Sequence, residues 1–290
     1  MIRFTKMQGI GNDYVYVNGF EQSVDEPSEL AVEIADRHFG VGGDGLILLL
    51  PPEPGADADV RMRMYNADGS ESEMCGNGVR CVCKLAHDLG LTTRQPMRVQ
   101  TGRGVLSLDY ELDEDGLVRD VTVDMGEPIL RLAEIPVDES KIKESEKSVH
   151  TFEAHGIDFH AVFVSMGNPH AVIFARDIAA VNLQAVGPVL EKHEAFPKRM
   201  NIHFAHVHGR GEITMRTWER GSGITLACGT GACAVCVAAV LNRLTDREVL
   251  AHLPGGDLAI RWDEASNHVF MTGPAVEVFR GEWRGVPVNR

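Results

Sequence analysis

Apolar and polar residues alternate along several short segments of the chain. In GVLSLDYEL (104–112), the apolar side chains from Leu106 to Leu112 fall on one face, and the hydroxyl and acidic side chains between them fall on the other. The same period of two recurs in VRDVTVDMG, ITMRTWE, DLAIRW and AVEVF. Because side chains alternate between the two faces of a strand, this pattern predicts half-buried strands in antiparallel or mixed sheets with one face in water.

Three segments instead have features of helices. SELAVEIADRHFG (28–40) offers Ser28 as an N-cap and ends at Gly40, and GVRCVCKLAHDLG (78–90) ends at Gly90 in the same manner. GACAVCVAAVLNRL (231–244) is so uniformly apolar that we expect a central, buried helix. The stretch 131–150 carries both signs of charge without any period, which predicts a surface loop or an insertion near the crossover between the domains.

A cysteine–glycine–X–glycine sequence occurs twice, as MCGNG (74–78) and ACGTG (227–231). Each copy follows a polar, glycine-bearing loop and leads into one of the predicted apolar helices. The six cysteines divide three and three between the halves, and 290 residues exceed a typical single-core domain. We therefore predict two similar domains, each with several strands around one hydrophobic helix.

The composition is that of an ordinary globular protein, with 44% hydrophobic and 24% charged residues. A net charge of −14 with scattered basic residues argues against nucleic acid or an anionic membrane as a partner. The N-terminal segment has no signal-peptide pattern, and no apolar run approaches the length of a membrane span. We expect a cytoplasmic protein with reduced thiols, in which six cysteines are too sparse for a disulfide scaffold.

The placement of Cys75 and Cys228 before helices suggests a chemistry. Flanking glycines let successive N–H groups point at an anion, and a helix N-terminus lowers the pKa of a thiol from about 8.5. Two such thiols at one site titrate as a coupled pair, so one thiolate faces one thiol. A base and an acid on opposite sides of a carbon are what inversion of a stereocentre requires, without a metal or a cofactor.

The motifs together resemble those of the diaminopimelate epimerase family. GNDYVYVN, NADGSE, MCGNGVRC, VSMGNPHAV and ERGSGITLACGTGACA stand in the family's order and span most of the chain. Related racemases, such as proline racemase, usually carry a histidine after the first Cys-Gly, where this chain has Asn77. The resemblance implies reversible epimerisation of LL- and meso-2,6-diaminopimelate for lysine and peptidoglycan precursor synthesis, in a homodimer.

The resemblance also implies roles for individual residues. Cys75 and Cys228 would be the acid–base pair, and His170 and Glu219 match positions important for activity. The substrate would be bound by a larger set, namely Asn12, Asn66, Gly76, Asn77, Asn168, Asn201, Glu219, Arg220, Gly229 and Thr230.

The implied fold is α+β, with two pseudo-symmetric domains that face each other across a cleft holding the active site. The N-terminal domain would comprise residues 1–128 and 275–290, and the C-terminal domain residues 129–274. The chain departs from the family at Gly45, where some members have glutamine, and at Ile224, usually glutamate.

Two alternatives remain open from the sequence. The same thiols could racemise another amino acid, such as histidine. The six thiols could instead belong to a metal-binding or redox protein, since Cys233 and Cys236 have CxxC spacing. However, their surroundings are uniformly apolar and lack the turn residues of a zinc knuckle, so we assign Cys81, Cys83, Cys233 and Cys236 to packing.

Overall fold

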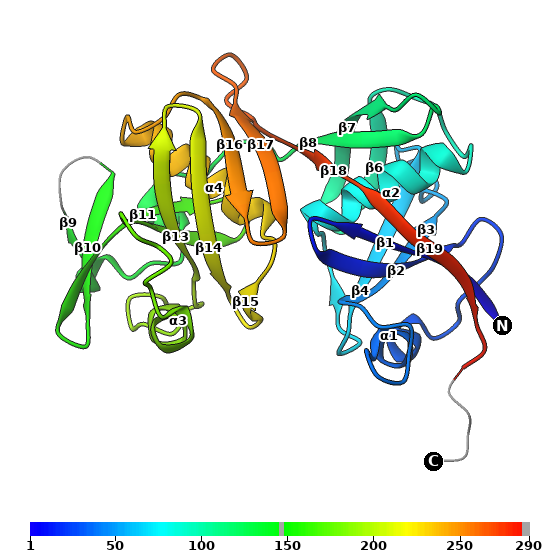
Figure 1. Cartoon of the computed structure of the whole chain (residues 1–290), viewed down its shortest axis with the longest axis horizontal. Coiled ribbons are helices and arrows are strands. Elements are labelled where there is room, and N and C mark those ends of the chain that lie inside the picture. The colour runs from blue at the N-terminus through cyan, green and yellow to red at the C-terminus, as the bar shows by residue number, and fades with distance from the viewer. Residues whose placement is uncertain (145–147, 286–290) are drawn as a thin grey trace. The chain divides into compact units, whose positions relative to one another are not determined.

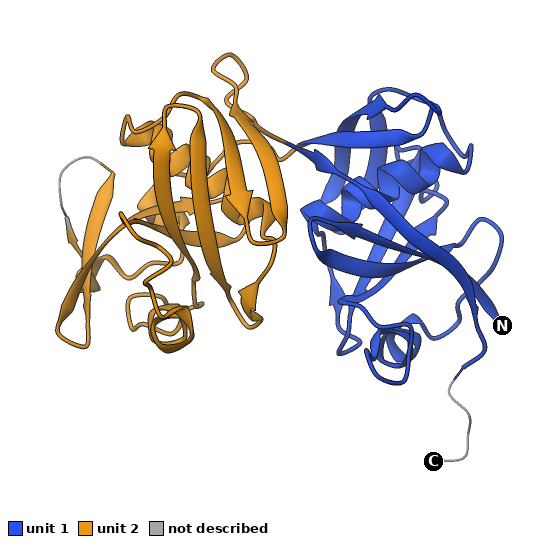
Figure 2. Ribbon diagram, in the orientation of Figure 1, with its two compact units in different colours: residues 1–123, 272–290 blue, residues 124–271 orange. Residues whose placement is uncertain are grey.

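The computed structural model describes residues 1–144 and 148–285. The chain divides into two compact units (Figure 2). Unit 1 comprises residues 1–123 and 272–290, of which 286–290 lie outside the described residues, and unit 2 comprises residues 124–271. Within these described residues, each unit has strands in mixed pairing and two α-helices.

Unit 1 is built on a sheet of mostly antiparallel strands (Figure 1). Neighbouring strands follow the order β19, β1, β2, β3, β4, β6, β7 and β8, with β5 beside β4. Among the strand pairs recorded for the described residues of unit 1, only β2–β3 and β4–β6 are parallel. The strands are β1 (Ile2–Gly9), β2 (Asn12–Asn18), β3 (Gly45–Leu50), β4 (Val60–Asn66), β5 (Glu71–Ser72), β6 (Met97–Thr101), β7 (Gly104–Leu112), β8 (Val118–Asp124) and β19 (Val276–Trp283).

Two helices pack on the strands of unit 1. Helix α2 (Gly76–Asp88) is buried from Gly76 to Ala86 and contacts six strands, β1 to β4, β6 and β7. Helix α1 (Pro27–Ala35) buries Ala31 and Ile34 in a second cluster with Val15 and Leu46. The helix that carries Cys75 at its start is therefore the central one.

Unit 2 has a corresponding set of elements. Helix α4 (Gly229–Leu241) contacts β11 to β14, β16 and β17 and is almost completely buried, whereas helix α3 (Leu183–Glu191) packs against β13 to β15. The strands are β9 (Lys143–Glu144), β10 (Val149–Ala154), β11 (Ile157–Ser165), β12 (Pro169–Phe174), β13 (Asn201–Gly209), β14 (Glu212–Glu219), β15 (Gly223–Thr225), β16 (Glu248–Leu253), β17 (Gly256–Trp262) and β18 (Val269–Pro274).

The two units share one topology. In unit 1 the chain runs β1, β2, α1, β3, β4, β5, α2, β6, β7, and in unit 2 it runs β11, β12, α3, β13, β14, β15, α4, β16, β17. Successive neighbours in the sheet are antiparallel, parallel, antiparallel, parallel and antiparallel in both. The prediction of an α+β fold with sheets around central hydrophobic helices is confirmed.

Some sequence-based expectations for local structure were wrong. Helix α1 begins at Pro27 and ends at Ala35 rather than at Gly40, and Ser28 lies in its first turn, where its hydroxyl donates to the Gly69 carbonyl (2.6 Å). Helix α3 was not predicted, because Pro188 stands inside it. The stretch 131–150, of which 145–147 lie outside the described residues, contains two short 3₁₀ turns and strand β9 beside β10.

Candidate active site

Cys75 is the N-cap residue of helix α2. Its extended backbone (φ −132°) lets the sulfur accept a hydrogen bond from the Gly78 N–H at 3.4 Å. The thiol donates to Asn12 Oδ1 at 3.2 Å. The sulfur therefore sits at the positive end of the helix dipole, which favours negative charge there.

Asn12 is held in place from behind by acidic and basic side chains. Its Nδ2 donates to Asp44 Oδ2 at 2.6 Å, and Arg37 binds the other oxygen of that carboxylate at 3.0 Å. Since the amide nitrogen is engaged by Asp44, the amide oxygen is the atom turned toward the Cys75 thiol.

The side chains of two other predicted substrate ligands in unit 1 form hydrogen bonds to neighbouring side chains. Asn66, at the end of β4, donates to Ser70 Oγ at 2.9 Å across a turn. Asn77 is buried, and its Oδ1 accepts a bond from Arg80 Nη1 at 3.0 Å. Arg80, which the sequence reading missed, is completely buried and also donates to the Pro274 carbonyl at 3.2 Å, so it fixes the first turn of α2.

The departure at Gly45 has a steric basis. A Cβ added at this position would lie 2.0 Å from the backbone oxygen of Tyr65 on the neighbouring strand. Neither the Gly45 backbone nor the Tyr65 carbonyl can move easily, because both belong to the hydrogen-bonded strands β3 and β4. This backbone therefore has no room for the glutamine that some family members carry here.

Cys228 occupies the equivalent position in unit 2. It is the N-cap residue of α4, with an extended backbone (φ −131°) and 5% exposure. Its sulfur lies 3.8 Å from the hydroxyl of Thr230, which in turn accepts a hydrogen bond from Asn168 Nδ2 at 3.2 Å. Gly229 and Gly231 flank this turn, and a Cβ at Gly231 would lie 2.9 Å from the Cys228 sulfur.

Behind Asn168 lies a buried pair of histidines. His170 Nε2 bonds Asn168 Oδ1 at 3.0 Å, and His170 Nδ1 bonds His203 Nε2 at 2.9 Å. His203 Nδ1 bonds the hydroxyl of Thr217 at 2.9 Å. Both rings are completely buried. Burial lowers the pKa of His170 well below its usual value and that of His203 to about 3, so both are neutral imidazoles.

The remaining predicted residues of unit 2 lie around one loop. Asn201 is buried; its Nδ2 donates to the Pro169 carbonyl at 2.8 Å, and its Oδ1 accepts from the Arg220 N–H at 2.9 Å. The carboxylate of Glu219 accepts a bond from the Thr225 hydroxyl. Arg220 is exposed, and its guanidinium donates to the Lys198 carbonyl at 3.1 Å. Asn201 thus ties the turn before β12 to the loop after β14.

A buried glutamate supports the same loop and was missed from the sequence. Glu191, 3% exposed at the end of α3, accepts from the Gly221 N–H at 3.1 Å and from Trp218 Nε1 at 2.7 Å. The role of this carboxylate could not be predicted from the sequence, because its hydrogen-bond partners lie some thirty residues further along the chain.

Comparison with known proteins identifies the family. The family model described as "Diaminopimelate epimerase" matches residues 4–131 and 162–278. The diaminopimelate epimerase of Desulfovibrio desulfuricans is 55% identical over 287 residues, covering 97% of this chain and 98% of its own. That of Acetivibrio thermocellus is 52% identical over 281 residues, with the same coverage of both chains. The chain belongs to the diaminopimelate epimerase family.

Solved structures show that the fold of this diaminopimelate epimerase family member extends to more distant proteins. A PhzF-family phenazine biosynthesis protein of Bacillus anthracis matches with a TM-score of 0.69 at 16% identity, covering 99% of each chain. A probable proline racemase of Agrobacterium radiobacter matches with a TM-score of 0.67 at 13% identity, covering all of this chain and 94% of its own. At such identities the likeness concerns the fold alone.

The other cysteines of this family member are embedded in the cores. Cys81, Cys83, Cys233 and Cys236 are all completely buried. Burial raises the pKa of Cys81 to about 11 and that of Cys236 to about 12. No cluster of three or more His, Cys, Asp or Glu side chains suited to a metal ion occurs in residues 1–144 and 148–285. In the same ranges, no helix is long and apolar enough to cross a membrane.

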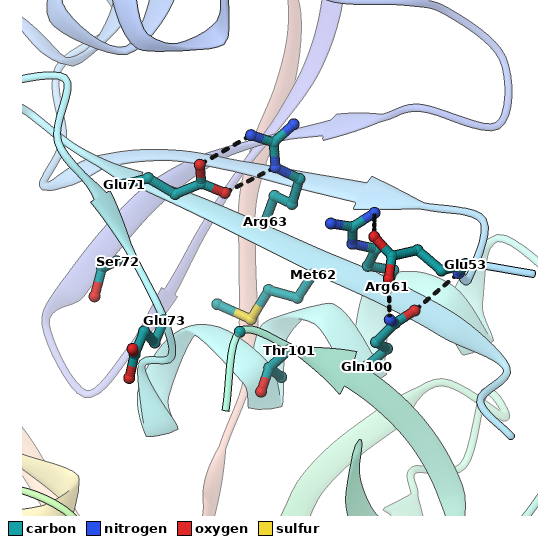
Figure 3. Close-up of a pocket in the computed structure, with 10 residues that line it drawn as sticks. Glu53, Arg61, Met62, Arg63, Glu71, Ser72, Glu73, Gln100 and Thr101 are labelled. Atoms are coloured by element: carbon teal, nitrogen blue, oxygen red, sulfur yellow. Dashed lines mark hydrogen bonds and ion pairs between the residues drawn. The ribbon is translucent and has the colours of Figure 1, made fainter. Parts of the chain in front are cut away.

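A hollow of about 320 Å³ lies beside β4 and β5 of unit 1 (Figure 3). Two of its arginines are engaged by carboxylates: Arg61 pairs with Glu53 at 2.6 Å, and Arg63 binds Glu71 through two nitrogens. Glu73 lines the hollow two residues before Cys75. None of the candidate active-site residues named above lines it.

Proposed function

We propose that this protein interconverts LL- and meso-2,6-diaminopimelate by moving a proton between substrate and two thiols. The observation that carries the proposal is the duplicated arrangement of Cys75 and Cys228, each the N-cap of a buried central helix, in a chain 55% identical to a diaminopimelate epimerase. This reaction belongs to lysine and peptidoglycan precursor synthesis in the cytoplasm, where thiols stay reduced.

In the proposed reaction the two cysteines act on opposite faces of one α-carbon. A thiolate takes the α-proton and becomes a thiol, and the electron pair of the broken C–H bond delocalises toward the α-carboxylate. The opposing thiol then gives its proton to the far face and becomes the thiolate. The stereocentre is inverted, and the enzyme still holds one thiol and one thiolate, but the two cysteines have exchanged these states. A proton must pass from one sulfur to the other, through solvent or free substrate, before the next turnover in the same direction.

Charge on the intermediate requires hydrogen-bond donors that are already in place. The backbone N–H groups at Gly76, Asn77, Gly229 and Thr230 open the two helices, where they would bind the α-carboxylate. A single donor of this kind contributes about 3–4 kcal/mol to a transition state.

The distal end of a diamino-diacid needs its own partners. Arg220 suits the distal carboxylate, and Glu219 the distal ammonium. We assign Asn66 to the same distal end of the substrate. Asn12 bonds the Cys75 thiol, and Asn168 bonds the Thr230 hydroxyl beside Cys228, so both lie near the reacting carbon in this proposal. The side chains of Asn77, Asn201 and His170 are buried, so we assign them to positioning these groups.

Proton exchange tests this function directly. In D₂O, the reduced enzyme should remove the α-proton signal of LL-diaminopimelate in the NMR spectrum while the meso isomer appears. Cys75→Ala and Cys228→Ala should each abolish epimerisation, whereas Cys236→Ala, which removes a buried thiol from the same helix as Cys228, should retain it. Epimerisation by either active-site variant at the wild-type rate contradicts the two-thiol mechanism. Exchange of another amino acid, such as histidine, in place of diaminopimelate contradicts the substrate assignment alone.

We also propose a homodimer. Three exposed apolar side chains gather on β19, namely Val276, Val278 and Phe279, at 40%, 54% and 46% exposure. Burying these apolar side chains against a second copy of the chain removes them from water, which favours association of the two copies. Light scattering should give twice the 31.7 kDa of the chain, and Val278→Lys should shift the population toward monomer.

A further inference from the structure

The shared topology allows each residue of unit 2 to be matched with a counterpart in unit 1. On β3 and β4, Ile47 stands opposite Met64, and on β13 and β14, His203 stands opposite Thr217. A Cβ at Gly78 of the first Cys-Gly-X-Gly turn would lie 2.8 Å from Ile47 Cδ1. A Cβ at Gly231 of the second would lie 2.4 Å from His203 Cε1. The Ile47–Met64 pair is therefore the counterpart of the His203–Thr217 pair.

The two pairs occupy the same place in the fold but differ in chemistry. Ile47 and Met64 are buried and apolar, 0% and 5% exposed. His203 and Thr217 are buried to the same extent, 0% and 3% exposed, but are polar. Burying polar groups costs free energy unless they are hydrogen-bonded. Since unit 1 shows that an apolar pair can fill this site, packing alone does not account for a histidine and a threonine in unit 2.

The hydrogen bonds of the polar pair form a chain with a defined direction. A neutral imidazole has one donor and one acceptor nitrogen. Because Asn168 Nδ2 donates to Thr230, its Oδ1 accepts from His170 Nε2–H. His170 Nδ1 is then an acceptor and receives the His203 Nε2 proton.

The same assignment of donors and acceptors gives the direction of the hydrogen bonds at both ends of this hydrogen-bond chain. His203 Nδ1, as the remaining acceptor, receives the hydroxyl proton of Thr217. At the other end, Asn168 donates to the Thr230 oxygen, and the Thr230 hydroxyl lies 3.8 Å from the Cys228 sulfur. When Cys228 is a thiolate it cannot donate, so the proton of the Thr230 hydroxyl is then directed at the sulfur. The chain of protons thus runs from Thr217 toward Cys228.

We propose that His203 and Thr217 are positioning residues that hold this chain in one direction, so that the Thr230 hydroxyl stabilises the Cys228 thiolate. The proposal rests on the proposed function, in which Cys228 must ionise. The groups that face His203 are His170 from β12, Thr217 from β14 and the Cys228–Gly231 turn of α4. Arg220 acts on His170 through its positive charge. In this arrangement the two imidazoles transmit orientation and do not take up protons.

The test replaces the polar pair by its own counterpart. The His203→Ile/Thr217→Met variant installs the pair that unit 1 already accommodates at this place. The rate of alkylation by iodoacetamide is followed against pH without substrate, and the labelled peptides of Cys75 and Cys228 are measured separately by mass spectrometry. We expect the apparent pKa of Cys228 to rise by about one unit, since one charge-assisted hydrogen bond is lost. Cys75, in the other unit, should show no such rise, because coupling between the two thiols can only ease its ionisation, and it serves as the comparison within each sample.

Two single substitutions test the same proposal if the double variant does not fold. Thr217→Val keeps the shape of the threonine and removes only the proton donated to His203, so it should raise the pKa of Cys228 in the same direction. His203→Gln keeps an N–H that can reach His170 and should give the smaller shift. For Thr217→Val, kcat should fall about tenfold with little change in KM.

The outcomes separate this inference from the proposed function. An unchanged pKa of Cys228 in folded Thr217→Val, or an equal shift at Cys75, overturns the positioning role. The alkylation readout needs no turnover, so a rise in pKa at Cys228 without a rise at Cys75 supports the inference even for an enzyme that fails to epimerise diaminopimelate. Failure of the wild-type protein in the D₂O experiment, by contrast, overturns the proposed function alone.

Discussion

Gly231→Ala is the substitution for which the structure gives the clearest expectation. Alanine normally stabilises a helix relative to glycine by up to about 1 kcal/mol. At this position, however, the new Cβ would lie 2.4 Å from His203 Cε1 and 2.9 Å from the Cys228 sulfur. The sign of the effect therefore depends on whether those neighbours can move.

The imidazole has little freedom to move. Its two nitrogens are bonded to His170 and Thr217, both at 2.9 Å, and the ring is completely buried. Overpacking a core site of this kind costs about 1–3 kcal/mol, which exceeds the helix-propensity gain. We expect net destabilisation of about 1–2 kcal/mol, or a Tm lower by about 3–6 °C. We therefore expect the Cys228 sulfur to move, and a displacement near 1 Å to lower kcat about 100-fold.

Gly78→Ala is the matched control in unit 1. The nearest atoms to its Cβ are Ile47 Cδ1 at 2.8 Å and Met62 Cε at 3.2 Å, the ends of flexible apolar side chains, and Cys75 Cβ lies at an ordinary 3.5 Å. This variant should lose less than about 1 kcal/mol and remain within tenfold of wild-type activity. Urea denaturation and α-proton exchange in D₂O measure both effects. Equal stability and activity of the two variants would refute the reasoning.

Three further predictions follow from other buried groups. Glu191→Gln should raise KM about tenfold with normal circular dichroism, because the bond that holds the Gly221 N–H weakens while the fold persists. Iodoacetamide at pH 8 should label neither Cys81 nor Cys236, whose pKa values of about 11 and 12 keep them protonated, and peptide mapping checks this. The pKa of His203, lowered to about 3, makes the unfolded chain bind one more proton below pH 6.5. The free energy of unfolding should therefore fall by about 1.4 kcal/mol for each unit that the pH is lowered between pH 6 and 4. The double variant Thr217→Val/His203→Ile lacks this imidazole, so urea titrations should show a smaller dependence on pH.

Much of the fold could be predicted because its signals are local. The period-two segment 104–112 is strand β7, although Leu112 at its end is 46% exposed. The apolar run after Cys228 is the buried helix α4. Helix α3 was not predicted because Gly187 and Pro188 interrupt the helical pattern. Glycine is required at position 187, since a Cβ there would lie 2.3 Å from the Trp218 ring. Tertiary packing outweighs local propensity at that place.

The site could be predicted as a set of residues but not as a set of contacts. The family resemblance implies Asn77 and Asn201, yet a sequence does not reveal which way an amide points. In the structure the first bonds Arg80 and the second bonds the Pro169 carbonyl. His203 gave no signal as a single histidine on an apolar strand. Only the register of β13 and β14 against that of β3 and β4 distinguishes it from an ordinary core residue.

The duplication implies that the two thiols need different surroundings. Asn12 and Asn168 lie at the starts of the equivalent strands β2 and β12, but Asn12 accepts from the Cys75 thiol, whereas Asn168 donates to the hydroxyl beside Cys228. The counterpart of Asn201 is Gly45, which has no side chain at all, and the counterpart of His203 is Ile47. A symmetric pair of identical thiols would share one proton without preference. The two sulfurs instead have different partners, the Gly78 N–H and Asn12 at Cys75 and the Thr230 hydroxyl at Cys228. In the proposed mechanism the two directions of proton transfer would therefore start from unequal thiols.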